Sequence, residues 1–316
     1  MKIIITSVGR RVELIQLFKK AACRLGVELE IFGADISDLV PALFFCDKKV
    51  LVPLISDQSY IPTLIEICKT NRIDALIPTI DTDLLLLAKN AAEFEAVGTK
   101  VLISPLDKIE VCRDKNFTSG FFRSCGLHAP TTYNNCSKYD GGFPCFIKPK
   151  DGSSSIDAYK INNTEELLEF ANRVNNYIIQ PFVDGEEYTV DIFCDFDGNP
   201  VYITPRKRIA VRAGEVLKTE IVCDDNIIEE CRVLIDKFKP VGAITVQLIK
   251  EKNTGINYYI EINPRYGGGA PHSIMAGADS PGAVIRILSG EKLGFEKNAA
   301  EPGAVFSRFD QSIRVK

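Results

Sequence analysis

Short apolar runs alternate with amphipathic stretches over the N-terminal third of the chain. The apolar runs have the length of buried strands and lie at residues 2–7, 28–34, 50–52, 74–78 and 100–103. Several are separated by stretches with apolar positions at helical spacing, at residues 10–25, 58–71 and 82–95. Alternating strands and helices predict a parallel sheet with helices on both faces, so we expect residues 1–104 to form an α/β domain.

The pattern changes after Ser104 and Pro105, where strands and helices no longer alternate one by one. Helices are predicted at residues 107–111, 114–124, 164–175 and 225–238. Strands are predicted at 142–149, 158–161, 177–191 with a bend, 200–210, 212–222 and, at the end of the chain, 306–315. We expect α+β architecture here.

A β-hairpin is predicted where residues 243–250 and 257–263 alternate apolar and polar positions on either side of Asn253-Thr-Gly255. A turn centred on Thr254 places Gln247 opposite Glu261, with Cβ atoms about 5 Å apart. The same register pairs Val246 and Leu248 with Ile262 and Ile260 on the opposite face, where all four can enter a core. Asn263 leaves the strand on the same face as Glu261.

The polar face of this hairpin gathers oxygen donors from Gln247, Glu261 and Asn263. Mg²⁺ typically takes one or two carboxylates together with substrate phosphate oxygens, so this donor set suits it. Arg265 and three glycines follow directly, and a guanidinium there can bind a phosphate or a carboxylate. The alternative is a surface hairpin whose polar residues simply face water.

Lys148 ends a predicted strand and is followed by a loop of small residues, Asp151-Gly-Ser-Ser-Ser-Ile156. Such a loop lets backbone N–H groups approach phosphate oxygens closely, and the lysine adds a positive charge. The alternative is an ordinary connection between two strands. Further on, the bend after Gln180 can present backbone groups to an adenine edge, with Glu187 placed to accept hydrogen bonds from a ribose.

Arg206, Arg208 and Arg212 have even spacing, so they share one face if their strand is continuous. They indicate either a charged edge strand or a site for an anionic substrate. His272, next to the glycines, is either structural or in contact with substrate. In the α/β domain, residues at the carboxyl ends of strands are either ligand contacts or helix caps; these are Ser7, Asp35, Thr79, Asp81 and Thr82.

The amino-acid composition indicates to which broad class of protein the chain belongs. The chain of 316 residues is 46% apolar and 25% charged with a net charge of −4, which is typical of a soluble globular protein and gives no indication of a nucleic-acid partner. No apolar run reaches the length of about 20 residues needed to cross a bilayer. The ten cysteines form no CxxC pair, so we expect reduced thiols and a cytoplasmic location.

These features, in this order, resemble the ATP-grasp superfamily, and most closely its branch similar to the large chain of carbamoyl phosphate synthase. The resemblance covers nearly the whole chain. It implies a Rossmann-like pre-ATP-grasp domain over residues 1–104. An ATP-grasp fold of two subdomains then follows: a small lid subdomain with linking helices over 105–184, and a C-terminal subdomain with the metal site over 185–316.

The resemblance also implies roles for individual residues. It implies ATP binding by Lys115, Lys148, Gly152, Ser153, Ser154, Ser155, Gln180, Pro181, Phe182, Val183 and Glu187. Gln247, Glu261 and Asn263 would hold one or two Mg²⁺ ions, which Mn²⁺ can replace. Catalytic roles fall to Lys148, Arg212 and Arg265, and substrate contacts to Arg206, Arg208, Arg212, Gly268 and His272. The family more often has glutamate at positions 180 and 247, so Gln247 leaves one negative charge fewer at the metal.

The implied activity is that of a carboxylate–amine ligase. A substrate carboxylate attacks the γ-phosphate of ATP, and an amine then displaces phosphate from the resulting acyl-phosphate to form an amide. The implied partners are small molecules, with a homodimer expected and no nucleic acid or membrane. Carbamoyl phosphate synthesis is not expected, because that large chain carries two copies of this unit and this sequence has one. The alternatives are a carboxylase or kinase of a small acid, or an ATP-binding regulatory protein.

Overall fold

The N-terminal domain is built on a five-stranded parallel sheet, as the alternating pattern predicts. In a computed structural model of the protein, which describes residues 1–151, 157–212 and 214–315, the strand order of this sheet is β3-β2-β1-β4-β5. The strands are β1 (Lys2–Thr6), β2 (Glu30–Asp35), β3 (Lys48–Leu51), β4 (Ala75–Pro78) and β5 (Lys100–Val101). The last of these is shorter than expected.

Helices lie on both sides of this sheet. They are α1 (Val12–Leu25), α2 (Tyr60–Asn71), α3 (Leu84–Lys89) and α4 (Ala91–Ala96), with the 3₁₀ helix η1 at Pro41–Phe44. The single helix expected over 82–95 is therefore wrong: it is divided at Asn90. That residue leaves helical geometry, and its side-chain amide donates to the carbonyl of Leu86 at 2.7 Å. This local bond competes with a continuous helix.

The C-terminal half is organised around a six-stranded antiparallel sheet of order β13-β12-β9-β10-β11-β14. Its strands are β9 (Gly185–Cys194), β10 (Pro200–Arg212), β11 (Glu215–Ile221), β12 (Gly242–Glu251), β13 (Asn257–Asn263) and β14 (Val305–Ser307). The expected closing strand over 306–315 is thus reduced to three residues. Since β10 lies between β9 and β11, the edge-strand explanation of its arginines is wrong.

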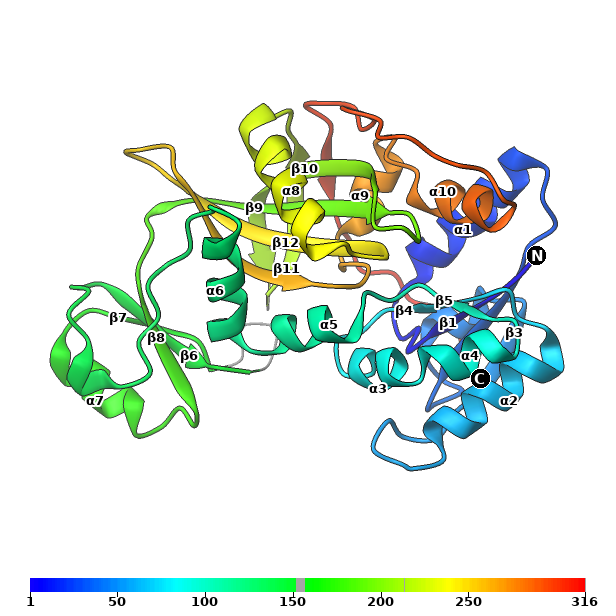
Figure 1. Ribbon diagram of the computed structural model, residues 1–316, viewed down its shortest axis with the longest axis horizontal. Helices are drawn as coiled ribbons and strands as arrows, with labels where there is room; N and C mark the ends of the chain where they lie inside the picture. The colour runs from blue at the N-terminus through cyan, green and yellow to red at the C-terminus, as the bar shows by residue number, and fades with distance from the viewer. Residues whose placement is uncertain (152–156, 213, 316) are drawn as a thin grey trace.

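A smaller three-stranded antiparallel sheet, β7-β6-β8, carries the lysine and the bend singled out above. It consists of β6 (Cys145–Pro149), β7 (Tyr159–Ile161) and β8 (Tyr177–Pro181), covered by α7 (Thr164–Ala171). Between this sheet and the N-terminal domain run α5 (Leu106–Arg113), α6 (Lys115–Ser124) and η2 (Cys136–Lys138). Figure 1 shows the small sheet and the N-terminal domain at opposite ends of the molecule, with the six-stranded sheet between them.

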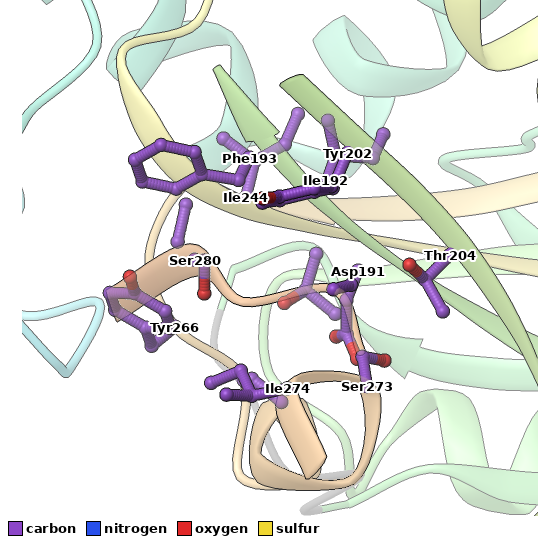
Figure 2. A pocket seen from close by; sticks show the side chains of 15 residues that line it. Asp191, Ile192, Phe193, Tyr202, Thr204, Ile244, Tyr266, Ser273, Ile274 and Ser280 are labelled. Atoms are coloured by element: carbon purple, nitrogen blue, oxygen red, sulfur yellow. The ribbon is translucent and has the colours of Figure 1, made fainter. Parts of the chain in front are cut away.

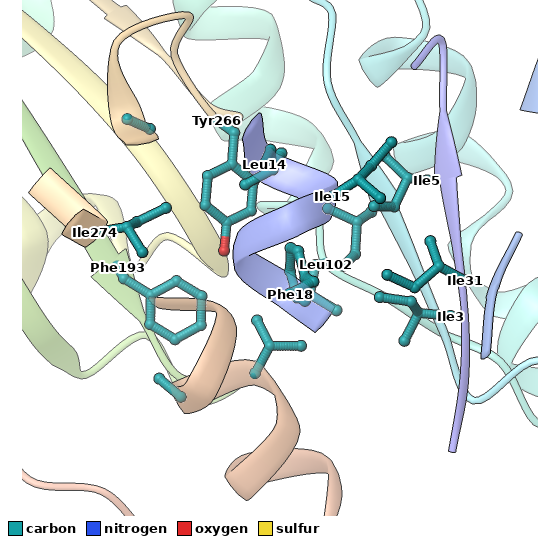
Figure 3. Packing of buried hydrophobic residues seen from close by; sticks show 14 of the residues in the cluster. Ile3, Ile5, Leu14, Ile15, Phe18, Ile31, Leu102, Phe193, Tyr266 and Ile274 are labelled. Atoms are coloured by element: carbon teal, nitrogen blue, oxygen red, sulfur yellow. The ribbon is translucent and has the colours of Figure 1, made fainter. Parts of the chain in front are cut away.

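One apolar core joins the N-terminal domain to the C-terminal half. Figure 3 shows Leu14, Ile15 and Phe18 of α1 packed between Ile3 and Ile5 on one side and Phe193, Tyr266 and Ile274 on the other. The helices α9 (Ala270–Met275) and α10 (Ser280–Leu288) contact α1 directly. A second core lies under α8 (Asp225–Phe238) and α6, against the six-stranded sheet. The shared first core fixes how the two halves face each other.

The hairpin of β12 and β13 has the predicted register around Gln247. Gln247 lies opposite Glu261, and Val246 opposite Ile262. A β-bulge follows, because Leu248 pairs with Tyr259 instead of Ile260. The extra residue turns Ile260 toward the same side as Glu261, so its expected burial in the core is wrong and fully buried Tyr259 takes that place.

Gly185 begins β9 at the junction with the small sheet, opposite Glu251 of β12. A Cβ atom there would lie 2.2 Å from the carbonyl oxygen of Lys250 and 2.6 Å from Cγ2 of Ile249. We therefore predict that Gly185→Ala lowers the free energy of unfolding by about 1–3 kcal/mol, as overpacking does. Chemical denaturation followed by circular dichroism measures this.

Gly294→Ala is the matched control, because a Cβ at Gly294 meets no atom within 4 Å. This variant should stay within about 0.5 kcal/mol of the parent protein. Equal stabilities for the two variants would show that the strand junction is looser than the structure indicates.

Candidate active site

A cleft of about 570 Å³ opens where the three sheets meet. The small sheet forms one wall, β12 and β13 another, and the strand-end loops of the N-terminal domain close one end. It brings together most of the residues to which the sequence assigns a role: Lys115, Lys148, Gln180, Pro181, Val183, Glu187, Arg206, Arg208, Gln247, Glu261, Asn263, Arg265 and Gly268.

Three assigned residues lie elsewhere. Phe182 packs against Phe146 with ring centroids 5.8 Å apart instead of lining the cleft. Arg212 is exposed and pairs with Asp310 at 3.1 Å, because irregular pairing between Arg208 and Val211 takes it off the shared face. His272 is buried and stacks on Phe306. The assigned residues Gly152, Ser153, Ser154 and Ser155 lie outside the described part of the chain.

A chain of polar contacts runs from the expected metal ligands to the N-terminal domain. The Nδ2 group of Asn263 donates to Oε1 of Glu261 at 2.9 Å, and Oδ1 of Asn263 accepts from Nη2 of Arg265 at 3.2 Å. The same Nη2 donates to Oδ2 of Asp81 at 2.7 Å. Arg265 keeps a buried Nε without a hydrogen-bond partner in the structure, which suits an anionic ligand.

The donor set fits a hard cation. Glu261 supplies one carboxylate, Asn263 and Gln247 supply amide oxygens, and all three line the same cleft. Within the described residues, no group of three or more histidine, cysteine, aspartate or glutamate side chains is placed to hold a metal ion. A site with one carboxylate depends on oxygens brought by a ligand, as Mg²⁺ sites at phosphates do.

Two lysines face this carboxylate from the opposite wall. Burial lowers the pKa of Lys148 to about 8, the charge of Glu261 opposes that change, and Lys115 adds to it. Burial also lowers the pKa of Lys115, which starts α6. The two ammonium groups repel one another and are poorly hydrated. An anion bound between them and the β13 strand would therefore be strongly stabilised.

Arg206 lies at the base of the cleft and is only 1% exposed. Its Nε donates to Oδ2 of Asp191 at 2.6 Å, and Ser273 donates to that same oxygen at 2.5 Å. Figure 2 shows Asp191 and Ser273 pointing toward each other beside a small cavity of about 20 Å³. Arg206 is thus held in one orientation by the buried carboxylate of Asp191.

Arg208 is the second arginine of β10 in the cleft. Its Nε lies 3.3 Å from Oε2 of Glu187 but lacks hydrogen-bond geometry, and its Nη2 donates to the carbonyl of Gly214 at 3.0 Å. Glu187 itself is largely exposed at the rim. Because Glu187 is exposed and makes no hydrogen bond to Nε of Arg208, that buried Nε is open to an anionic ligand.

The walls near the bend of the small sheet are apolar. Phe146, Val183, Leu248, Ile249 and Ile260 line this part of the cleft. Gln180 is buried there, with its Nε2 donating to Oγ1 of Thr132 at 3.0 Å. The β-bulge contributes Ile260 to the lining. A flat apolar slot that leads to a charged region suits an aromatic base attached to phosphates.

Arg11 and Glu215 also line the cleft, although the sequence pattern assigned neither of them a role. Arg11 belongs to the loop after β1, and its Nη2 donates to the carbonyl of Thr79 at 3.3 Å. Its position after the carboxyl end of a parallel strand could have indicated a role in ligand binding. Thr79, Asp81 and Thr82, which follow the carboxyl end of another strand of the same sheet, also reach the cleft. Ser7 and Asp35 do not line it, and Asp35 instead accepts from the backbone N–H of Gly9.

Comparison with known proteins agrees with this geometry. Residues 3–102 match the family model described as "PylC-like, N-terminal domain". Residues 154–309 match the model described as "ATP-grasp in the biosynthetic pathway with Ter operon". The first model covers the N-terminal α/β domain, and the second covers most of the rest of the chain but not residues 103–153.

Curated relatives are similar in sequence to parts of the chain. The D-alanine–D-alanine ligase of Thermoanaerobacter sp. is 29% identical over 207 residues, which are 53% of this chain and 54% of that protein. The carbamoyl phosphate synthase large chain of Thermomicrobium roseum is 23% identical over 228 residues, 65% of this chain and 21% of that protein. The chain thus spans about half or less of the length of these relatives.

Solved structures share the fold over nearly the whole chain. The biotin carboxylase domain of Hydrogenobacter thermophilus 2-oxoglutarate carboxylase, a dimer in complex with MgADP, has a TM-score of 0.76 at 15% identity. The match covers 96% of this chain and 73% of that one. An ADP complex of N5-carboxyaminoimidazole ribonucleotide synthetase has a TM-score of 0.75 at 17% identity and covers 95% and 79%.

The chain belongs to the ATP-grasp superfamily. Its N-terminal α/β domain and the following ATP-grasp fold confirm the predicted fold class. No helix in the described ranges combines the length and apolar character of a membrane span.

We predict that Lys148 titrates near pH 8 in the free protein, about two units below an ordinary lysine. Glu261→Gln should lower this pKa further, because the carboxylate charge stabilises the ammonium. NMR of the lysine side chains, assigned with Lys148→Arg, measures both values. Lys252 is an internal control, since its hydrogen bond to Asp184 raises its pKa. An ordinary pKa for Lys148 would contradict its burial between two charged walls.

Proposed function

We propose that the protein is an ATP-dependent carboxylate–amine ligase that forms an amide through an acyl-phosphate and releases ADP and phosphate. The observation that carries this proposal is the position of two half-buried lysines opposite the Glu261–Asn263 strand, with Arg265 at the end of that strand. This arrangement is suited to bind a polyphosphate and to neutralise charge at its terminal group.

The nucleotide is proposed to lie along the cleft from the small sheet toward the N-terminal domain. Its adenine would occupy the apolar slot near Gln180, Pro181 and Val183, with the ribose near Glu187. Lys115 and Lys148 would hold the phosphates. The ATP-binding role of Gly152, Ser153, Ser154 and Ser155 stays a prediction, because these residues lie outside the described part of the chain. The predicted contact of Phe182 is confined to its backbone, because its side chain packs away from the cleft.

Mg²⁺ would be held by Glu261, Asn263 and Gln247. When bound, it would neutralise phosphate charge and align donor and acceptor oxygens. Arg265 is proposed to stabilise negative charge on the transferred phosphoryl group through its buried Nε. The carboxylate of the acid substrate would attack that group, and an amine would then displace phosphate from the acyl carbon. Closure of the cleft would keep water from the acyl-phosphate.

Amide formation is favoured by the curated relatives, two of which are D-alanine–D-alanine ligases of 29% and 31% identity over part of the chain. The carboxylases among the structural neighbours keep an alternative open, in which bicarbonate or a small acid is phosphorylated without an amine. Substrates are proposed to be small molecules. The homodimer, the cytoplasmic location and the replacement of Mg²⁺ by Mn²⁺ stay predictions.

The direct test is ADP release with Mg-ATP against a panel of amino acids and small carboxylates, supplied singly and in pairs. We predict release only when an acid and an amine are both present, together with an amide product detected by mass spectrometry. Release that needs bicarbonate or one acid alone would instead indicate the carboxylase or kinase alternative. Nucleotide binding without any turnover would favour a regulatory protein.

Glu261→Ala should reduce ADP release by about a hundredfold or more, because it removes the one carboxylate of the proposed metal site. Its fold should persist, since Glu261 lies in the cleft and not in a core. The matched control is Glu251→Ala on the same hairpin, where the carboxylate only caps the turn. Turnover unchanged by Glu261→Ala would refute the metal assignment.

A further inference from the structure

The end of the cleft at the N-terminal domain carries a group of five charged side chains from five separate stretches of the chain. We call it the domain-interface cluster: Arg11, Asp81, Glu215, Arg265 and Arg308. All of its members except Arg308 line the cleft directly. None of them belongs to the part of the cleft proposed for adenine and ribose.

Two of the three arginines in this cluster have a carboxylate partner. Arg265 pairs with Asp81 at 2.7 Å, and Arg308 pairs with Glu215 at 2.8 Å. Arg11 forms no ion pair within the described residues, and the hydrogen bond found for it there goes to the carbonyl of Thr79. The cluster therefore holds three guanidinium groups against two carboxylates, and Arg10, outside the cleft lining, also lies 3.6 Å from Glu215. Within the described residues, Arg11 is the member of the cluster whose positive charge has no carboxylate in an ion pair with it.

The surroundings of Arg11 disfavour its charge in the absence of an anion. Burial lowers the pKa of Arg11 to about 10; the nearby charges of Arg265 and Arg308 contribute to the same shift, and those of Glu215 and Asp81 oppose it. A guanidinium keeps its charge at neutral pH even so. A partly desolvated cation with cationic neighbours is a strong attractor for a carboxylate that enters the cleft.

The glycine segment after Arg265 leaves room for a ligand beside Arg11. A Cβ atom on Gly268 would lie 3.2 Å from Nη1 of Arg11 and 3.6 Å from Oε1 of Glu215. A Cβ on Gly269 would lie 2.9 Å from Nη2 of Arg206. Side chains at these positions would crowd the arginines, so the absence of side chains keeps their guanidinium edges open to the cleft.

We propose that Arg11 binds a second carboxylate of the acid substrate, so that the acid activated by this protein is a dicarboxylic acid. The reacting carboxylate lies toward Arg265 and the β13 strand, and the second carboxylate forms a bidentate pair with Arg11. This specificity rests on the proposed function, because it takes the same cleft as the site of an acid substrate. One carboxylate matches the single uncompensated charge of the cluster.

The test is equilibrium binding, so that it does not depend on turnover. Short dicarboxylic acids and amino dicarboxylic acids are titrated calorimetrically into the protein saturated with Mg²⁺ and a non-hydrolysable ATP analogue. Each acid is compared with its mono-amide, for example glutamate with glutamine and succinate with succinamate. The amide keeps the shape of the acid and removes one charge. We expect the best diacid to bind about ten- to a hundredfold more tightly than its mono-amide.

Arg11→Gln should abolish this preference, so that diacid and mono-amide bind equally weakly. Arg11→Lys keeps the charge without the planar fork and should retain part of the preference. Arg10→Gln is the matched control, because it removes the same charge one residue away. The Arg10 side chain is 79% exposed and outside the cleft lining, and its contact with the cluster is an ion pair with Glu215 at 3.6 Å, which is looser than the 2.8 Å pair of Arg308 with Glu215. The Arg10→Gln variant should keep the full preference, and circular dichroism checks that each variant is folded.

Several outcomes would overturn the proposal. These are equal binding of diacids and mono-amides by the parent protein, a preference that survives in Arg11→Gln, and no binding of any diacid. Tighter binding of a phosphorylated acid such as O-phosphoserine would assign Arg11 to a phosphate group instead of a carboxylate. A diacid preference without any ADP release would support the role of Arg11 and contradict only the ligase chemistry.

Discussion

The ion pair between Arg265 and Asp81 joins the two halves of the molecule at the cleft. It continues a chain of contacts that begins at Glu261 and passes through Asn263, so the proposed metal strand is tied directly to a loop of the N-terminal domain. The pair can form only because the core around α1 holds the two halves in one orientation. Everything proposed for phosphate and acid binding depends on this alignment.

The cleft is lined by several lysine and arginine side chains, and within the described residues some of them have no carboxylate beside them to balance their charge. Burial depresses the pKa of both Lys148 and Arg11. These shifts share one cause, since each group is charged in a place poor in water and rich in other positive charges. A polyphosphate and an acid substrate would bring negative charges close to these cations. Their binding would therefore be stabilised by the compensation of the positive charge.

Local patterns were enough to predict the fold class and the pairing of Gln247 with Glu261, since alternation and turn position fix a hairpin register. They could not predict the bulge that moves Ile260 to the cleft, because its cause lies in packing around Tyr259. The prediction that Arg206, Arg208 and Arg212 share one face is wrong for Arg212, because the pairing of its strand is irregular just before it. Arg11 was missed because its neighbours in the cleft are far away in sequence.

The most direct test of this account is a crystal structure with Mn²⁺ and a non-hydrolysable ATP analogue, in which anomalous scattering locates the metal. We expect Mn²⁺ within about 2.5 Å of oxygens from Glu261 and Asn263, the phosphates against Lys115 and Lys148, and the base in the slot beside Val183. A metal bound by other side chains, or a nucleotide outside this cleft, would contradict it.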